Sequence, residues 1–240
     1  MNGTYQNIDC MELMATLKDK EIDLAIVDPP YGIGESCGKN ASRNKGFNGN
    51  RLKMTFSRDY GNKDWDKKTP DENYFRELKR VSKNQIIFGG NYFINYLDNT
   101  SCMIVWDKDN GESDFADCEL AWTSFKTAVR KIKFRWNGLL QEHMKNKEIR
   151  FHPTQKPVKL YEWLLTNYAK PNDLILDTHC GSASSLIACE NLGFKYIASE
   201  LDKDYYHQSL QRLETHLSQG KLFQRVGRDE IRLEQPSMFA

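Results

Sequence analysis

The sequence predicts an α/β fold in which helices cover both faces of a mostly parallel sheet. Three observations favour this fold class. Short runs rich in β-branched and aromatic residues alternate with segments of helical periodicity, which is typical of parallel strands joined by helices. Capping residues and glycines stand where several helical patterns begin or end. The chain has 240 residues, enough for one sizeable domain with an adequate core.

The individual elements follow from the spacing of apolar residues. The predicted strands span residues 4–8, 23–28, 84–89, 102–107, 119–125, 173–177 and 195–200. The predicted helices span residues 11–19, 71–82, 91–98, 157–168, 183–192 and 203–218. Asp202 is the expected N-cap of the last helix. Gly193 and Gly220 are the expected C-terminal stops of the last two helices.

Two long segments lack any periodic pattern. Residues 32–68 are rich in Gly, Asn and Lys, and residues 127–152 form a second irregular insert. Loops of this length inside a compact domain are usually functional or mobile. The final residues, 221–240, are expected to form a short, loosely attached arm.

Composition limits the class of protein. Charged residues make up 28% of the chain and the mean hydropathy is −0.70. No apolar run approaches the roughly 18 residues that a membrane span needs, and the start MNGTYQNIDC does not resemble a signal peptide. The six cysteines show no CxxC pair and no regular spacing. We therefore expect a cytoplasmic protein with reduced thiols, no metal site and no membrane partner.

Basic charge is clustered, although the net charge is only +1. Residues 39–58 carry six Lys or Arg and no acid, and residues 126–135 carry five and no acid. Clustered basic residues with interleaved aromatic residues are typical of nucleic-acid binding, and solvated surface loops are the alternative interpretation. The candidate nucleic-acid contacts are Lys39, Arg43, Lys45, Arg51, Lys53, Arg130, Lys131, Lys133 and Arg135.

Three predicted strands end in an acidic residue: Asp28, Asp177 and Glu200. Ligands of open α/β sheets bind at these carboxyl ends. Asp177 is followed by a turn of small residues and then a helix, which lets a ligand approach the backbone and the helix N-terminus. Glu200 lies 23 residues further on, at the end of the next strand. This order is typical of a carboxylate that holds the ribose of an adenosine cofactor.

Residues 25–34 read AIVDPPYGIG and end a buried strand with an acid, two prolines and an aromatic residue. The prolines fix the backbone beyond the strand. A carboxylate and a neighbouring carbonyl can then both accept hydrogen bonds from one amino group, and a flat ring offers about 1–3 kcal/mol of stacking to a base. This set suits the exocyclic amino group of a nucleobase. The alternative is a strand-ending turn with an incidental acid.

Three segments together resemble the β class of S-adenosylmethionine (AdoMet)-dependent DNA amino-methyltransferases, in which the order of motifs is permuted. DPPY at 28–31 resembles the catalytic motif of the family, and LDTHCGSAS resembles its cofactor loop DPFxGSGT. HPTQKP at 152–157 resembles the segment that precedes this loop. The resemblance implies a Rossmann-like AdoMet-dependent methyltransferase fold, with a mostly parallel seven-stranded sheet and a small target-recognition insert. It also implies methylation of adenine N6, because cytosine-N4 enzymes more often carry Ser in place of Asp28.

The resemblance assigns roles residue by residue. The implied catalytic residues are Asp28, Pro29, Pro30 and Tyr31. The implied cofactor-binding residues are Asp9, Lys156, Asp177, His179, Gly181, Ser182, Glu200 and Asp202. Asp9 is equally suited to cap the helix that follows it. Thr178 and His179 depart from the family's Pro-Phe, and Ala183 replaces its second glycine, so His179 either stacks as the Phe does or weakens cofactor binding.

The resemblance also implies a division of the chain. The parts are a catalytic half (residues 1–126), a short target-recognition insert (127–151), the AdoMet-binding half of the same domain (152–220) and a C-terminal arm (221–240). The expected substrate is an adenine flipped out of double-stranded DNA. The alternatives are cytosine N4, an adenine in RNA, or a DNA-binding protein that has lost transfer. Methylation of a protein glutamine is disfavoured, because that family carries Asn in place of Asp28.

Two further partners are predicted as alternatives: a second copy of the chain and the bacterial sliding clamp. Members of this class are often dimers, so a homodimer is an open alternative. In the tail EQPSMFA, residues Gln235, Met238 and Phe239 resemble the QxxLF-type peptide that docks on the bacterial sliding clamp. A terminal Gln with two apolar anchors suits binding of a peptide in a groove, and a frayed terminus that packs on the domain is the alternative.

Overall fold

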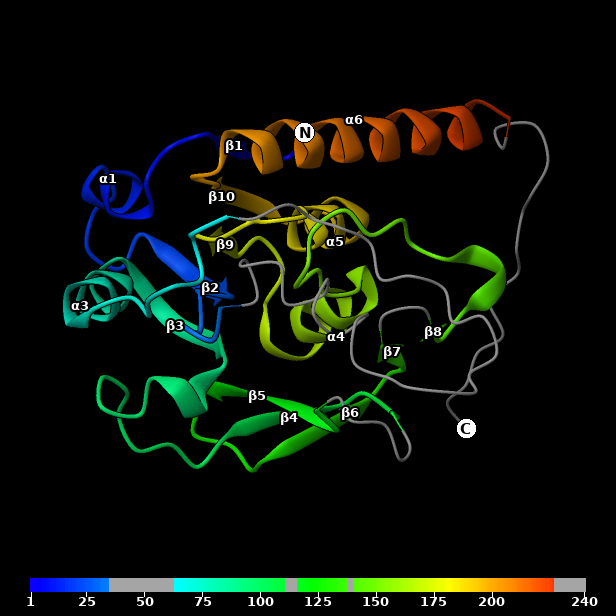
Figure 1. Ribbon diagram of the computed structural model, residues 1–240. Coiled ribbons are helices and arrows are strands. Elements are labelled where there is room, and N and C mark those ends of the chain that lie inside the picture. Colours follow the sequence, from blue (N-terminus) through cyan, green and yellow to red (C-terminus); the bar gives the residue numbers. More distant parts are fainter. Residues whose placement is uncertain (35–62, 111–115, 138–139, 227–240) are drawn as a thin grey trace, which may run out of the picture.

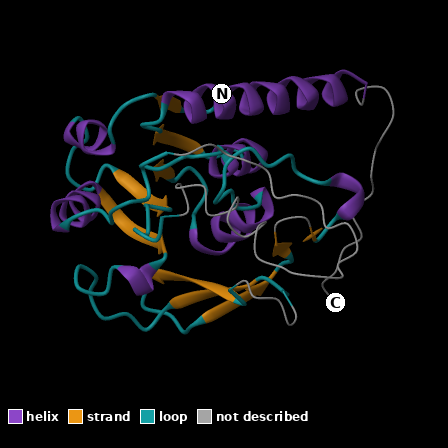
Figure 2. Cartoon of the chain, viewed as in Figure 1, coloured by secondary structure: helices purple, strands orange, loops and turns teal. Residues whose placement is uncertain are grey.

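The fold is an eight-stranded mixed sheet with helices on both faces (Figures 1 and 2). It is seen in a computed structural model that describes residues 1–34, 63–110, 116–137 and 140–226. The strands of the sheet are β1 (Thr4–Gln6), β2 (Ile22–Val27), β3 (Ser82–Phe88), β4 (Met103–Asp107), β5 (Cys118–Thr123), β6 (Arg130–Lys133), β9 (Leu174–Asp177) and β10 (Lys195–Ser199). The α-helices are α1 (Cys10–Ala15), α3 (Glu72–Val81), α4 (Val158–Tyr168), α5 (Ser184–Leu192) and α6 (Lys203–Val226).

The strands follow the spatial order β1-β10-β9-β2-β3-β5-β4-β6. Strand β5 is antiparallel to both of its neighbours, and the other neighbouring pairs are parallel. The predicted strands are therefore all present in a mostly parallel sheet. The order also interleaves the two ends of the chain, because β9 and β10 lie between β1 and β2.

Alternate side chains of the central strands face two separate apolar cores. Leu24 and Ile26 of β2 pack on the face covered by α4, α5 and α6. Ala25 and Val27 pack on the opposite face with α1 and α3. A strand buried on both faces reads as a continuous apolar run, which explains why LAIV was a clear signal in the sequence.

The sheet has a strand that the sequence did not predict, inside the insert taken to be irregular. Residues 130–133 form β6, which pairs in parallel with β4. Only Ile132 of this short strand is buried, so its apolar alternation was too short to recognise. The insert continues with a two-stranded hairpin, β7 (Trp136–Asn137) and β8 (Leu140–Gln141), and the 3₁₀ turn η2 (Met144–Asn146).

The helix predicted over 91–98 is wrong. The structure has only the 3₁₀ turn η1 (Gly90–Tyr92) after β3, followed by irregular chain. Gly89 turns the chain sharply with φ +68°. Phe93 and Tyr96 then pack against the ring of Phe75, with ring centroids 5.2 and 5.4 Å away. Aromatic packing of the segment against α3 therefore replaces regular helix.

The predicted end of the last helix is also wrong. Gly193 ends α5 with φ +77°, as expected of a C-terminal glycine. Helix α6, in contrast, continues through Gly220 to Val226, so the first residues of the expected arm are helical. A glycine inside a helix costs about 1 kcal/mol, which neighbouring turns can offset. In the part of the chain that the structure describes, no helix has the length and apolar character to cross a membrane.

Candidate active site

The acidic residues predicted from strand ends gather at one edge of the sheet. Strands β1, β10, β9 and β2 are consecutive neighbours and all parallel, so their carboxyl ends meet. Asp9, Glu200, Asp177 and Asp28 follow these four strands in that spatial order. The edge therefore brings together a catalytic candidate and three cofactor candidates that lie far apart in the sequence.

Asp28 is held from both sides of its carboxylate. The Tyr31 hydroxyl donates to Oδ1 over 2.7 Å, and Lys156 Nζ donates to Oδ2 over 2.5 Å. Only 14% of the Asp28 side chain is exposed. Burial raises the pKa of Asp28, and the Lys156 ammonium opposes this rise.

Lys156 lies against Asp28, although the sequence assigned it to the cofactor. Its side chain is 3% exposed, and its Nζ is also 3.3 Å from Oε2 of Glu119. Glu119 is in turn paired with Lys108. Burial lowers the pKa of Lys156, but Asp28 and Glu119 outweigh it and raise the pKa above its ordinary value. Glu119 and Lys108 were missed because nothing in their local sequence distinguishes them from surface charges.

Tyr31 is packed between a glycine turn and a second tyrosine. Its ring stacks on Tyr92 with a centroid distance of 4.9 Å and an interplanar angle of 14°. Tyr92 is 45% exposed. A Cβ added at Gly89 would lie 2.2 Å from Tyr31 Cε1, so glycine is required there. Tyr92 lies in the wrongly predicted helix, and its role at the site was missed.

Asp177 is buried, and no cation pairs with it among the described residues. The hydroxyl of Ser185 donates to Oδ2, and the backbone N–H of His179 donates to Oδ1 over 3.0 Å. Burial raises the pKa of Asp177 to about 7. Asp177 thus shapes the loop that follows β9 through hydrogen bonds to that loop and to the first turn of α5.

His179 is a half-buried, neutral ring beside an aromatic neighbour. Its Nδ1 lies 2.9 Å from Oγ1 of Thr178, and its ring meets Tyr74 edge-on with centroids 5.3 Å apart. Thr178 also hydrogen-bonds the Tyr74 hydroxyl over 2.7 Å. Burial lowers the pKa of His179 to about 4. The Thr-His pair therefore supplies a flat uncharged ring fixed by α3.

Glu200 and Gly181 are joined directly. The Gly181 N–H donates to Oε2 of Glu200 over 2.8 Å, and the Asp202 N–H donates to Oε1 over 2.8 Å. Gly181 has φ +52°, which side chains rarely adopt, so the backbone beside Glu200 stays bare. Each carboxylate oxygen can accept a second hydrogen bond, so Glu200 keeps acceptor capacity for ribose hydroxyls.

Asp202 and Asp9 both cap helices. Asp202 Oδ1 accepts the backbone N–H groups of Asp204 and Tyr205, which confirms the predicted N-cap of α6. Asp202 also accepts from Lys63 Nζ over 2.6 Å. Asp9 caps α1 by accepting the Met11 N–H over 2.8 Å. The capping interpretation of Asp9 is therefore confirmed, and its contact with a cofactor remains a prediction.

The turn that leads into α5 contains a strained alanine. Ala183 has φ +59° and is fully buried, at the position of the family's second glycine. Arg212 of α6 braces the turn by donating to Ser182 O over 2.7 Å and to Ser184 Oγ over 2.9 Å. Arg212 could not be recognised from the sequence, because its partners are 28 and 30 residues away.

A cavity of about 240 Å³ lies at this edge of the sheet. Its walls include Pro30 of the DPPY segment, His179 of the loop after β9, Cys10 and Met11 of α1, and Tyr74 of α3. Binding sites for small molecules usually enclose about 300–1,000 Å³, so this cavity is large enough for only part of a cofactor. It connects the DPPY segment with the predicted cofactor loop, and its walls combine the flat rings of Tyr74 and His179 with the charged residues Lys68 and Asp71.

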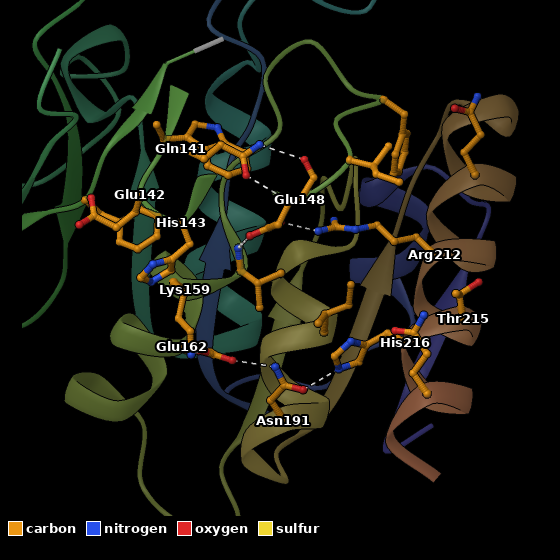
Figure 3. A pocket seen from close by; sticks show the side chains of 18 of the residues that line it. Gln141, Glu142, His143, Glu148, Lys159, Glu162, Asn191, Arg212, Thr215 and His216 are labelled. Carbon is orange, nitrogen blue, oxygen red and sulfur yellow. Dashed lines mark hydrogen bonds and ion pairs between the residues drawn. The ribbon is translucent and has the colours of Figure 1, made fainter. Parts of the chain in front are cut away.

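A larger cavity of about 740 Å³ lies on another side of the molecule, between α4, α5, α6 and residues 134–151 (Figure 3). None of the predicted site residues lines it. Its walls are joined by internal bonds, such as those from Glu148 to Arg212 at 2.6 Å and from His216 to Asn191 at 2.6 Å. It separates the insert from the helices and does not belong to the site at the sheet edge.

The predicted nucleic-acid contacts are only partly described. Lys39, Arg43, Lys45, Arg51 and Lys53 lie outside the described residues. Arg130, Lys131, Lys133 and Arg135 are all exposed, on or just beyond the edge strand β6. Three of them form ion pairs with the end of β4: Lys131 with Asp107, and Lys133 and Arg135 with Asp109. Part of the positive charge is thus offset by acids that the sequence did not place nearby.

The two histidines of the motifs are not grouped as metal ligands. His152 lies between the rings of Trp65 and Tyr205, with centroid distances of 5.2 and 4.3 Å. Burial lowers its pKa to about 3. Among the described residues, no group of three or more His, Cys, Asp or Glu is placed to hold a metal ion.

Comparison with known proteins gives a family and several relatives. The family described as DNA methylase (N6_N4_Mtase) matches residues 96–211. The Type II methyltransferase M.HpaI of Haemophilus parainfluenzae is 25% identical over 252 residues, which cover 89% of this chain and 76% of that protein. The Type II methyltransferase M2.DpnII of Streptococcus pneumoniae is 24% identical over 253 residues, which cover 86% of this chain and 87% of that protein.

Solved structures share the architecture. The M1.HpyAVI–SAM complex superposes with a TM-score of 0.52 at 21% identity, covering 88% of this chain and 99% of that chain. The PvuII DNA methyltransferase, described as cytosine-N4-specific, gives a TM-score of 0.56 at 16% identity, covering 96% of this chain and 94% of that chain. At these identities the likeness shows the fold, and it confirms the predicted fold class.

Proposed function

We infer that this chain belongs to the amino-directed DNA methylases and transfers a methyl group from AdoMet to DNA. The observation that carries the inference is the meeting of DPPY with the loop after β9. Strands β2 and β9 are paired, and Pro30 and His179 line one cavity. A hydrogen-bond acceptor for an amino group therefore lies next to the predicted cofactor loop.

Within this function we propose adenine N6 as the acceptor. When bound, AdoMet supplies an electrophilic methyl group on a sulfonium sulfur. Asp28 and the Pro29 carbonyl accept hydrogen bonds from the amino group and orient its lone pair, and the Asp28 carboxylate stabilises the positive charge that develops on nitrogen. Tyr31 stacks on the flipped base. Because Tyr92 already covers one face of Tyr31, the base must displace Tyr92 or use another part of the ring.

The cofactor would be held by residues along the sheet edge. Glu200 would accept the ribose hydroxyls, Gly181 and Ser182 would present a bare backbone, and His179 would pack on the cofactor as a flat neutral ring. Asp177 would fix the loop that carries them. Asp9 and Asp202 are proposed as further contacts, and Lys156 acts through Asp28.

DNA recognition is proposed for the insert at 127–151 together with the basic segment 39–58. The DNA methylase family supports a DNA substrate, and we propose that this DNA is double-stranded. A homodimer, docking of Gln235, Met238 and Phe239 on a sliding clamp, and a cytoplasmic location remain proposals. Deletion of 235–240 without effect in a clamp pull-down would remove the docking proposal.

The experiment that tests the function is nucleoside analysis. The purified chain is incubated with AdoMet and unmodified duplex DNA, the DNA is digested, and the nucleosides are identified by mass spectrometry. We expect N6-methyl-2′-deoxyadenosine. N4-methyl-2′-deoxycytidine would keep the reaction and replace the base, whereas no product together with no AdoMet binding would favour a DNA-binding protein that has lost transfer.

A further inference from the structure

Four alternating charges run through the interior from Asp28. In order they are Asp28, Lys156, Glu119 and Lys108, and each is in contact with the next. Their side chains are between 3% and 21% exposed. The two carboxylates and two ammonium groups cancel, so the chain of charges is neutral as a set.

The sheet places these groups together. Asp28 follows β2, and Lys108 follows β4. Glu119 lies at the start of β5, which is antiparallel to β4, and Glu119 pairs in register with Trp106. Lys156 reaches this set from the segment just before α4, and its Nζ lies 4.7 Å from the centroid of the Phe88 ring. The ammonium is thus fixed by an aromatic ring of β3 as well as by two carboxylates.

The contacts determine what Asp28 can do. Lys156 occupies one acceptor direction on Oδ2 and Tyr31 occupies one on Oδ1. Each oxygen accepts two hydrogen bonds, so an amino group can still bind. The ammonium hydrogen-bonded to Oδ2 at 2.5 Å favours the charged carboxylate and so opposes the rise in pKa that burial causes in Asp28.

We propose that Lys156 is a positioning residue for methyl transfer, which keeps Asp28 ionised and orients its carboxylate toward the target amino group. Glu119, with Lys108 behind it, holds Lys156 in place. The proposal rests on the proposed function for its consequence in catalysis, but the contact between Lys156 and Asp28 stands on its own geometry.

Other titratable groups also face Asp28, and they do not replace Lys156. Asp177 of β9 interacts with Asp28 as a second negative charge and opposes its ionisation. Tyr74 of α3 and Tyr161 of α4 have pKa values well above the ordinary tyrosine value because both are buried. Both tyrosines stay uncharged and therefore add no negative charge beside Asp28. Among the described residues, Lys156 is the cation in contact with Asp28.

The direct test measures the titration of Asp28 without any substrate. Aspartate labelled with ¹³C at Cγ is followed by NMR, and the Asp28 signal is assigned by its loss in Asp28→Asn. In Lys156→Gln we expect the Asp28 midpoint to rise by about one pKa unit or more, a tenfold change in proton affinity. In Glu119→Gln the removed negative charge alone would lower the midpoint, so a rise would show that Glu119 holds Lys156 in place, and a fall would overturn that role of Glu119.

Lys159→Gln is the matched control. Lys159 is an exposed lysine three residues away that pairs with Glu162, so its loss leaves the Asp28 midpoint unchanged. An unchanged midpoint in folded Lys156→Gln would overturn the proposal. If Lys156→Gln does not fold, Lys156→Met takes its place, because it keeps the length of the buried stem and removes the charge. An unchanged midpoint in that variant overturns the proposal in the same way.

The catalytic consequence is tested by the pH dependence of single-turnover transfer to duplex DNA. We expect the acid limb of Lys156→Gln to move to higher pH by the same amount as the NMR midpoint, with the rate recovering at alkaline pH. A loss of rate by one constant factor at every pH would mean a merely structural role. If the wild-type chain transfers no methyl group, the proposed function fails, while the NMR titration still decides the role of Lys156.

Discussion

Asp28 and Asp177 are the same residue type, end paired strands and are both buried, yet they are stabilised differently. Asp28 has a cationic partner, Lys156, at 2.5 Å. Asp177 accepts hydrogen bonds from the Ser185 hydroxyl and the His179 N–H, and burial raises its pKa to about 7. The first arrangement supports a charged acceptor for an amino group. The second supports a structural carboxyl that shapes a loop and gains little from being charged.

We expect the largest effect from removing Asp28, which is the carboxylate paired with a cation. Asp28→Ala removes the acceptor for the amino group, and we expect the transfer rate to fall by at least about 10²–10³-fold. AdoMet affinity, measured by calorimetry, should persist. The counterpart is Glu200→Ala, which should weaken AdoMet binding several-fold and retain turnover at saturation. Near-normal turnover of Asp28→Ala would remove the assignment of this residue.

The second prediction concerns the pH dependence that follows from Asp177. Its pKa is about 7 in the folded state and about 3.9 in an unfolded chain. The folded state therefore binds more protons between these values, and the contribution of Asp177 to stability is lost as pH rises from about 4 to 7. At about 1.4 kcal/mol per pKa unit, the loss is of the order of a few kcal/mol.

Asp177→Asn removes this dependence, because the amide does not titrate. The free energy of unfolding of the variant should improve relative to wild type as pH rises from about 5 to 8 in urea titrations. A constant difference between the two proteins across this range would show that Asp177 is already ionised in the folded state.

The third prediction tests the packing that holds Asp28. Gly89→Ala places a Cβ 2.2 Å from Tyr31 Cε1 at φ +68°, so Tyr31 must shift away from Asp28. We expect a loss of about 2 kcal/mol or more in the free energy of unfolding, together with reduced transfer. Gly193→Ala is the control, because its φ is +77° and nothing lies within 4 Å of the added Cβ. Equal losses in both variants would mean that the Tyr31 contact is not rigid.

The smallest expected effect concerns the loop that Asp177 shapes. Ala183→Gly relieves a φ of +59°, which is worth about 1–2 kcal/mol. It also adds backbone entropy to the unfolded chain and removes a buried methyl, which cost about 0.5–1 and 0.8 kcal/mol. We therefore expect the free energy of unfolding to change by less than about 1 kcal/mol in denaturant titrations. A loss above 2 kcal/mol would show that the methyl packs better than its burial indicates.

Much of the fold could be predicted because its signals are local. LAIVD and LILD are strands buried on both faces, and each ends in the acid that the site uses. Gly193 and Asp202 were recognised because a cap depends on the residues next to it. The arrangement of these acids at one edge followed from the rule that parallel strands end together.

The features of the fold and the site that could not be predicted depend on contacts between residues far apart in the sequence. Lys156 meets Asp28 across 128 positions, and no pattern in HPTQKP indicates which carboxylate it binds. Glu119 reads as an ordinary exposed acid until β5 is known to run antiparallel beside β4. The helix predicted at 91–98 failed because aromatic packing on α3 overrode the local pattern.

The position of β1 beside β10 bears on how the protein is made. Thr4 pairs with Ile197 and Leu24 pairs with Ile175, so the first strands emerge from the ribosome long before their neighbours exist. At about 5–20 residues per second, the wait is on the order of 10 s or longer. During this time the nascent chain displays unpaired strand edges that chaperones can bind. The sheet edge that gathers Asp28, Asp177 and Glu200 is completed only after translation has passed β10, so a nascent chain that has not yet reached β10 has no assembled site with which to modify DNA.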